Sequence, residues 1–204
     1  MKTLHLATAV TAAIVSVGAG AWALHGNDRA PRPDAFAALD RSVLPVAAAA
    51  PLEVPALAGT DGRPFDAARL RGHWSLVFFG FTSCADVCPT TLQTLAQFAG
   101  DPASGVASGA TQVVFVSVDP ERDTPGRIQA YVDAFDKRFV GVTGDHAALA
   151  RFGAAAGAGF APNGNALDHS TSVFVVDPQG RLAGVLLHPA NGRSVRADLE
   201  SLRG

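Results

Sequence analysis

The chain contains two cysteines, Cys84 and Cys88, and they lie together in the stretch FFGFTSCADVCPTTL. An apolar run precedes the pair, and a helix that starts with a proline is expected after it. A helix N-terminus stabilises negative charge, and the thiolate is the reactive and metal-binding form of cysteine. His169, in the stretch LDHSTSVFVVD, is the best candidate for a third residue. Two thiolates and an imidazole can form a copper site, so this combination indicates copper chemistry.

The C-x-x-x-C spacing leaves several interpretations open. Both sulfurs can reach one ion or form a local disulfide. A purely stabilising disulfide is less expected, because a five-residue ring contributes roughly 2 kcal/mol whereas a loop of about 80 residues would contribute about 4.5. A structural zinc site needs four protein ligands, more than two cysteines supply. Asp86, between the cysteines, is either a turn residue or a residue that tunes a thiolate or a metal ligand.

The other histidines are weaker candidates. His73 opens the strand that leads to the thiols, so about seven extended residues place it roughly 20 Å away from them. His146 falls in the first turn of an expected helix, which favours a surface role. His188 ends the last expected strand and is a weak second candidate. His5 and His25 lie in or beside the N-terminal hydrophobic segment.

Apolar runs and turn signals predict alternating strands and helices. Strands are expected at 74–81, 112–118, 140–142, 171–176 and 182–187, and helices at 89–100, 125–135, 146–155 and 194–202. The continuous apolar runs are typical of strands that are buried on both faces of a sheet. Asp177-Pro178-Gln179-Gly180 indicates a hairpin turn. This order predicts an α/β protein with a thioredoxin-like fold, in which helices flank a central mixed sheet.

The N-terminus, residues 1–25, reads as a membrane anchor or a signal segment. The run from Leu6 to Leu24 has 19 residues, just enough to span a bilayer. Lys2 precedes it and is expected to stay inside, so the rest of the chain would be exported. Ala21-Trp22-Ala23 also has the form of a cleavage site, which keeps a cleaved soluble product as the alternative.

The remaining composition limits the possible functions. The net charge is −2 and no cluster of lysines and arginines is present, which argues against nucleic-acid binding. Met1 is the only methionine, which excludes copper sites with thioether ligands.

Residues 26–51 are rich in alanine, proline and arginine and are predicted to form a linker. Residues 52–204 are predicted to form one domain.

Four segments of this domain occur in a fixed order: FGFTSCADVCPTTL, VVFVSVDPERDTP, VTGD and LDHSTSVFVVDPQGRL. Together they resemble the SCO/SenC family of copper-assembly proteins for cytochrome c oxidase. The resemblance implies that one copper ion, as Cu(I) or Cu(II), is bound by Cys84, Cys88 and His169. It also implies that Asp86 lies next to the metal ligands and tunes them without binding the copper itself.

The chain departs from the family pattern at two positions. Ser83 stands where many members carry a histidine, and Ala85 stands where many carry a proline. Neither position is a copper ligand in the family, so the implied ligand set is complete. The changes bear on the rigidity of the loop and on the reactivity of the thiols.

The resemblance implies a copper metallochaperone, rather than an enzyme, that delivers copper to the CuA site of a cytochrome c oxidase subunit. Other copper carriers and thiol reductases are further expected partners. The implied location is the periplasm of a bacterium, with an anchor in the inner membrane. One alternative is a thiol–disulfide reductase in which Cys84 and Cys88 are catalytic. Another is a thiol peroxidase, because Thr82-x-Cys84 after a buried strand is loosely similar to peroxiredoxins.

Overall fold

The computed structural model describes residues 43–46, 51–163, 166–169 and 172–204, with only the backbone described for 160–163 and 166–169. The strands are β1 (Val43–Pro45), β2 (Leu57–Gly59), β3 (Pro64–Phe65), β4 (Trp74–Gly80), β5 (Thr111–Ser117), β6 (Val140–Thr143), β7 (Phe160–Asn163), β8 (Ala166–His169), β9 (Val173–Val176) and β10 (Leu182–Leu186). The helices are α3 (Val87–Gly100), α4 (Pro125–Asp133), α5 (His146–Ala156) and α6 (Gly192–Arg203), with short 3₁₀ turns η1 (Ala67–Leu70) and η2 (Pro102–Ser104).

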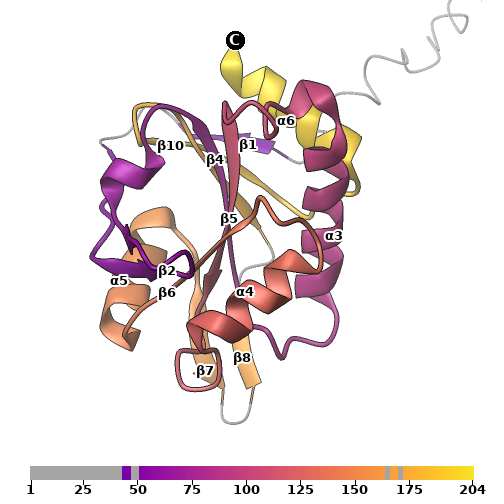
Figure 1. Cartoon of the computed structure of the whole chain (residues 1–204). Helices are drawn as coiled ribbons and strands as arrows, with labels where there is room; N and C mark the ends of the chain where they lie inside the picture. Colours follow the sequence, from indigo (N-terminus) through magenta and orange to yellow (C-terminus); the bar gives the residue numbers. More distant parts are fainter. Residues whose placement is uncertain (1–42, 47–50, 164–165, 170–171) are drawn as a thin grey trace, which may run out of the picture. The chain divides into compact units, whose positions relative to one another are not determined.

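A mixed sheet forms the centre of the described part of the chain (Figure 1). Its strand order is β1-β10-β9-β4-β5-β6-β2-β3. The neighbours β4, β5 and β6 run parallel, whereas β9 and β2 pair antiparallel with the two sides of this group. The most apolar strands, β4 and β5, therefore occupy central positions, as their continuous apolar sequences predict.

Helices cover both faces of this sheet, and alternate residues of each strand contact opposite layers. From β4, Leu76 and Phe78 join the core beneath α3, α4 and α6. Val77 and Phe79 join the core beneath η1 and α5. All four side chains are completely buried, which explains why β4 shows no polar alternation.

The predicted fold class is confirmed, and so are two predicted helix starts. Thr124 accepts a hydrogen bond from the Arg127 amide at the start of α4, and Asp145 accepts one from the Ala148 amide at the start of α5. The predicted start of α3 at Pro89 was wrong, because the helix begins at Val87. Proline is tolerated there since the first-turn amides of a helix have no intrahelical acceptor.

Two further expectations need correction. Strand β1 lies inside the predicted linker and pairs with β10, so the sheet begins before residue 52. Its partner is far away in sequence, and so local composition did not reveal the pairing. The hairpin of β7 and β8 was not predicted either.

None of the helices within the described ranges has both the length and the apolarity to cross a membrane, and the proposed anchor at residues 6–24 lies outside those ranges.

The turn that joins β9 to β10 depends on the carboxylate of Asp177. It accepts hydrogen bonds from the Gln179 amide at 2.9 Å, from the Arg181 amide at 2.9 Å and from Arg181 Nε at 2.8 Å. Burial, the largest influence, raises the pKa of Asp177, but the hydrogen bonds and the charge of Arg181 outweigh it and hold the pKa below its usual value.

We therefore predict that Asp177→Asn lowers the free energy of unfolding at pH 7 by about 1–2 kcal/mol. Because the folded pKa is depressed, the contribution is present above the unfolded pKa and disappears as the pH falls through the folded value. Urea unfolding at pH 7 and pH 3 measures both effects. Gln179→Ala is the control, since it retains the donating amide. An equal loss at the two pH values would contradict this account.

Candidate metal centre

The two cysteines lie on either side of the start of α3, Cys84 in the preceding loop and Cys88 in the helix. The chain leaves β4 and makes a turn in which the Cys84 amide donates to the Phe81 carbonyl at 3.2 Å. Cys88 is in the first turn of α3, and its amide donates to Cys84 Sγ at 3.4 Å. Both residues are thiols rather than halves of a disulfide. The positive end of the helix is therefore directed at the Cys84 sulfur, as expected for a site that binds a metal or reacts as a thiolate.

The two thiols differ in exposure. Cys84 is partly exposed, whereas Cys88 is completely buried in the core between α3 and the sheet. This close packing requires glycine at position 80, because a methyl group there would lie 2.9 Å from Cys88 Sγ and 2.9 Å from Phe115 Cε2. One sulfur thus faces the solvent side of the loop and the other faces the core.

Burial is also the main influence on the acidity of the inner thiol. It raises the pKa of Cys88, and the hydrogen bond with Cys84 and the charges of Cys84 and Asp123 act in the same direction. A backbone hydrogen bond with Phe81 opposes them in part. The inner sulfur therefore favours its protonated form unless something replaces the proton.

A buried carboxylate holds the loop that carries Cys84. Asp123 accepts hydrogen bonds from the Thr82 amide at 2.8 Å and from the Thr82 hydroxyl at 2.5 Å. Oδ2, which accepts from the Thr82 amide, also accepts from the Ser117 hydroxyl at 2.6 Å. Arg127 Nε lies 3.9 Å from the same carboxylate and donates to Thr82 Oγ1 at 2.8 Å. These contacts connect the thiol loop to β5 and to α4.

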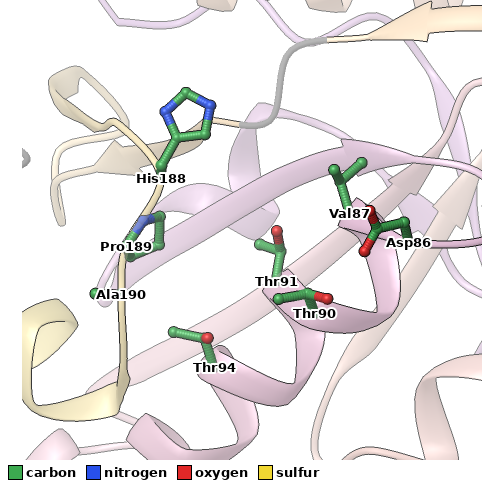
Figure 2. Close-up of a pocket in the computed structure, with 8 residues that line it drawn as sticks. All are labelled: Asp86, Val87, Thr90, Thr91, Thr94, His188, Pro189 and Ala190. Atoms are coloured by element: carbon green, nitrogen blue, oxygen red, sulfur yellow. The ribbon is translucent and has the colours of Figure 1, made fainter.

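Asp86 and His188 line a pocket at the N-terminal end of α3. Its volume is about 250 Å³, and its lining residues are Asp86, Val87, Thr90, Thr91, Thr94, His188, Pro189 and Ala190. Figure 2 shows the first five on α3 and its N-terminal end, with His188 and the two residues after it on the opposite side. Asp86 occupies the N-cap position, but its side chain makes no capping hydrogen bond. The start of α3 and the segment before α6 thus form a recess, and neither cysteine is among its lining residues.

The structure places His169 at the last position of β8, opposite Phe160 of β7. The sequence did not indicate a strand there, because its partner is another short, weakly apolar segment. In the main sheet, Val173 pairs with Phe78 near the end of β4 that leads to Cys84. His169 precedes Val173 by four positions in the chain, so the topology brings this segment toward the thiol end of the sheet.

The side chain of His169 lies outside the described part of the structure. Among the described residues, no group of three or more histidine, cysteine, aspartate or glutamate side chains is arranged to hold a metal ion. The weaker histidine candidates have other contacts. His73 precedes β4, and its Nε2 lies 3.0 Å from the Arg69 carbonyl. His146 Nε2 lies 3.4 Å from Glu121 Oε1 on the surface.

Sequence reasoning missed two residues that shape the site, Gly80 and Asp123. Asp123 lies directly before the Thr124 cap of α4 and reads as an exposed loop residue, although it is 1% exposed. The VSVDPERDTP segment, with two aspartates after a buried strand, was the available sign of a buried carboxylate.

Comparisons with known proteins agree with this architecture. A protein of Stutzerimonas stutzeri, described as a candidate copper-binding protein, is 35% identical over 139 residues, which are 65% of this chain and 67% of that one. The chain spans 57 to 67% of the length of this protein and of two further curated relatives.

Solved structures of Sco proteins have the same fold. Arabidopsis thaliana ScoI with copper bound matches with a TM-score of 0.67 and 26% identity, over 74% of this chain and 98% of that one. Bradyrhizobium japonicum ScoI with copper bound matches with a TM-score of 0.63 and 30% identity, over 76% of this chain and 99% of that one. The sequence profile described as SCO1/SenC matches residues 56–203, which include the whole thiol loop. The chain therefore belongs to the SCO1/SenC family.

Proposed function

We propose that the chain binds one copper ion through Cys84, Cys88 and His169 and delivers it to the CuA site of cytochrome c oxidase during assembly. The observation that carries the proposal is the contact between the Cys88 amide and Cys84 Sγ at 3.4 Å, which holds the loop thiol against the first turn of α3 that carries the second thiol. Two Sco proteins with the same fold have been captured with copper bound, which supports copper as the ion.

The proposed donor atoms, two sulfurs and one imidazole nitrogen, suit a copper ion that is bound and later transferred. Soft thiolates favour Cu(I), and two sulfurs with one imidazole allow three-coordinate binding. Cu(II) would gain an oxygen ligand in addition. Because Cys84 is partly exposed and Cys88 is buried, a ligand of an acceptor protein would approach from the Cys84 side. Copper would then move by ligand exchange, with the buried sulfur as the last to release it.

A thiol–disulfide reductase is the second candidate, favoured by the same two reduced thiols. The Cys84 thiolate would attack a partner disulfide, which forms a mixed disulfide and releases one partner thiolate. After losing its proton, Cys88 would attack Cys84 Sγ and release the second partner thiolate. The dithiol would be oxidised by two electrons and the partner disulfide reduced by two, so the step needs no other reactant.

The proposal also includes the location of the protein in the cell. We propose that residues 6–24 anchor the chain in the bacterial inner membrane and place the domain in the periplasm. Because β1 is part of the sheet, the tether between the anchor and Val43 has about 17 residues and an r.m.s. reach of roughly 20–25 Å. This reach suits an oxidase subunit whose copper site projects from the same membrane face.

The ligand assignment predicts that Cys84→Ser, Cys88→Ser and His169→Ala each weaken copper binding by at least about tenfold. Each substitution removes one donor atom of the proposed set. Competition of the reduced full-length chain with a chromophoric copper chelator measures the affinities. His73→Ala and His146→Ala are the matched controls and should bind like the wild type. Unchanged affinity in His169→Ala would remove that residue from the ligand set.

The redox state of the pair should control copper uptake. Coordination needs thiolates, so an intramolecular disulfide between Cys84 and Cys88 should prevent binding until a reductant restores the thiols. Mass spectrometry should show the loss of two hydrogens on oxidation, and copper titration before and after reduction checks the coupling. If the disulfide form took up copper as well as the dithiol, coordination through these sulfurs would be excluded.

In cells, deletion of the gene should lower the activity of CuA-containing oxidase under copper limitation, and added copper should restore part of it. Complementation should require Cys84, Cys88 and His169 together, whereas His73→Ala should complement fully. Oxidase activity of membranes measures the effect. Full activity in the deletion strain, in the absence of a second SCO-type gene, would favour the reductase over the delivery role.

A further inference from the structure

The recess between the start of α3 and the segment before α6 has a lining that the proposed copper ligands do not use (Figure 2). Val87, Pro189, Ala190 and the methyl groups of three threonines make much of its wall apolar. Asp86 is the only carboxylate in the lining, and no lysine or arginine is among the lining residues. Within the described ranges, its side chain makes no capping hydrogen bond and no ion pair. The recess therefore combines apolar walls with a negative charge that no ion pair within these ranges balances.

Two threonines of the lining offer further polar groups. Thr91 is 8% exposed and Thr94 is 6% exposed. No hydrogen bond joins either hydroxyl to another described residue, so both are available inside the recess, where they can accept as well as donate. The volume of about 250 Å³ lies below the range of about 300–1,000 Å³ that is usual for small-molecule sites. The recess is thus suited to one long side chain rather than to a whole cofactor.

The surface around the recess indicates contact with another protein. Of the three large hydrophobic side chains that are exposed in the described part of the chain, Val87 lines the recess and Leu187 directly precedes its lining residue His188. Their exposed fractions are 36% and 38%. His188 is also the only non-glycine residue within the described ranges that has a positive φ, at 49°, and such backbone is enriched at functional sites. Apolar side chains that gather at the mouth of a recess are typical of a protein-binding surface.

An arginine side chain matches this lining. Its methylene stem can lie along apolar surface while its charged head reaches a polar group. The guanidinium is planar, has five N–H donors and no acceptor, and binds a carboxylate through two parallel hydrogen bonds. Asp86 and the threonine hydroxyls supply the acceptors for these donors. Lysine carries a point charge with three donors and matches the combination less well.

We propose that the recess is a docking site for an arginine side chain of the protein that receives the copper ion. The inference rests on the proposed copper delivery and names the chemistry by which the acceptor is recognised. Asp86 and Val87 are two of the three residues between Cys84 and Cys88, so an arginine bound there holds the acceptor at the thiol loop. Arginine is also enriched among the residues that dominate the binding energy of protein interfaces.

A titration with N-acetyl-arginine amide tests the recess directly. The probe is added to the reduced, isotope-labelled full-length chain without metal, and amide chemical shifts are followed by NMR. Saturable shifts should be confined to residues 86–94 and 188–190. The neutral isostere N-acetyl-citrulline amide, and the arginine probe with Asp86→Asn, should each bind about tenfold more weakly, because the charge-assisted pair is lost.

Thr90→Arg tests the docking role, because it supplies the proposed occupant from the chain itself. Thr90 is exposed and lies four positions after Asp86 on α3, so the new guanidinium can pair with the Asp86 carboxylate. Copper affinity should equal that of the wild type. The rate of copper transfer to the apo CuA-bearing oxidase subunit of the same organism should fall at least about fivefold, since a charge contact at the interface governs association. Stopped-flow absorbance of the forming CuA centre measures the transfer.

Gln93→Arg is the matched control. Gln93 is exposed on the same helix, about 10 Å along its axis from Asp86, and is not a lining residue of the recess. The substitution adds the same charge and should leave probe binding and copper transfer at wild-type values.

Three outcomes would overturn the inference while the proposed function stands. They are equal transfer rates in wild type and Thr90→Arg, an equal loss in Gln93→Arg, and an arginine titration without saturable shifts in the recess. If the wild type itself transferred no copper to the oxidase subunit, the delivery role would fall, and this docking assignment with it.

Discussion

The buried carboxylate of Asp123 is the interaction on which the geometry of the thiol loop depends. It accepts the amide and the hydroxyl of Thr82 and the hydroxyl of Ser117, so three donors from two segments meet at one side chain. Without it, each of these buried donors would lose its partner at a cost of about 1–3 kcal/mol. The position of Cys84 is therefore set by a residue about forty positions later in the chain, through tertiary contacts rather than local turn preference.

The same arrangement makes the site continuous with the hydrophobic core. Cys88 belongs to the cluster that joins α3, α4 and α6 to the sheet, and its sulfur has room because position 80 is glycine. A sulfur held in a close-packed core has few alternative positions, whereas Cys84 at the loop surface has more freedom. In the proposed copper site, one fixed sulfur and one accessible sulfur would suit a protein that binds an ion and then transfers it.

The thiol loop has an exposed side, which carries Ser83 and Ala85, and a buried side, which holds the loop to the core. Ser83 and Ala85 replace the residues common in the family on the exposed side of the loop. The buried side of the loop, with Gly80, Thr82 and Asp123, is independent of these two replacements because its contacts use other atoms. The contacts that hold the thiol loop to the core can thus be kept while its outer surface changes.

Local sequence determined the elements whose cause is local. The apolar runs of β4 and β5 report burial on both sheet faces, and Thr124 and Asp145 cap the helices that follow them. These features depend on neighbouring residues only, and so they can be read without a structure. The cysteine pair belongs to the same class, because its spacing within one helical turn is a property of the chain itself.

Tertiary structure decided everything that depends on contacts between distant segments. The pairing of β1 with β10, the burial of Asp123 and the difference in exposure between Cys84 and Cys88 follow from how the layers pack. The hydroxyl of Tyr131, which has no hydrogen-bond partner among the described residues, belongs to this group as well, since the same residue on a helix face would read as ordinary core. Residue types and spacing thus identified the chemistry, while the environment of each sulfur emerged only when β4, β5, α3 and α4 came together, because burial and hydrogen bonding depend on neighbours that the sequence leaves far apart.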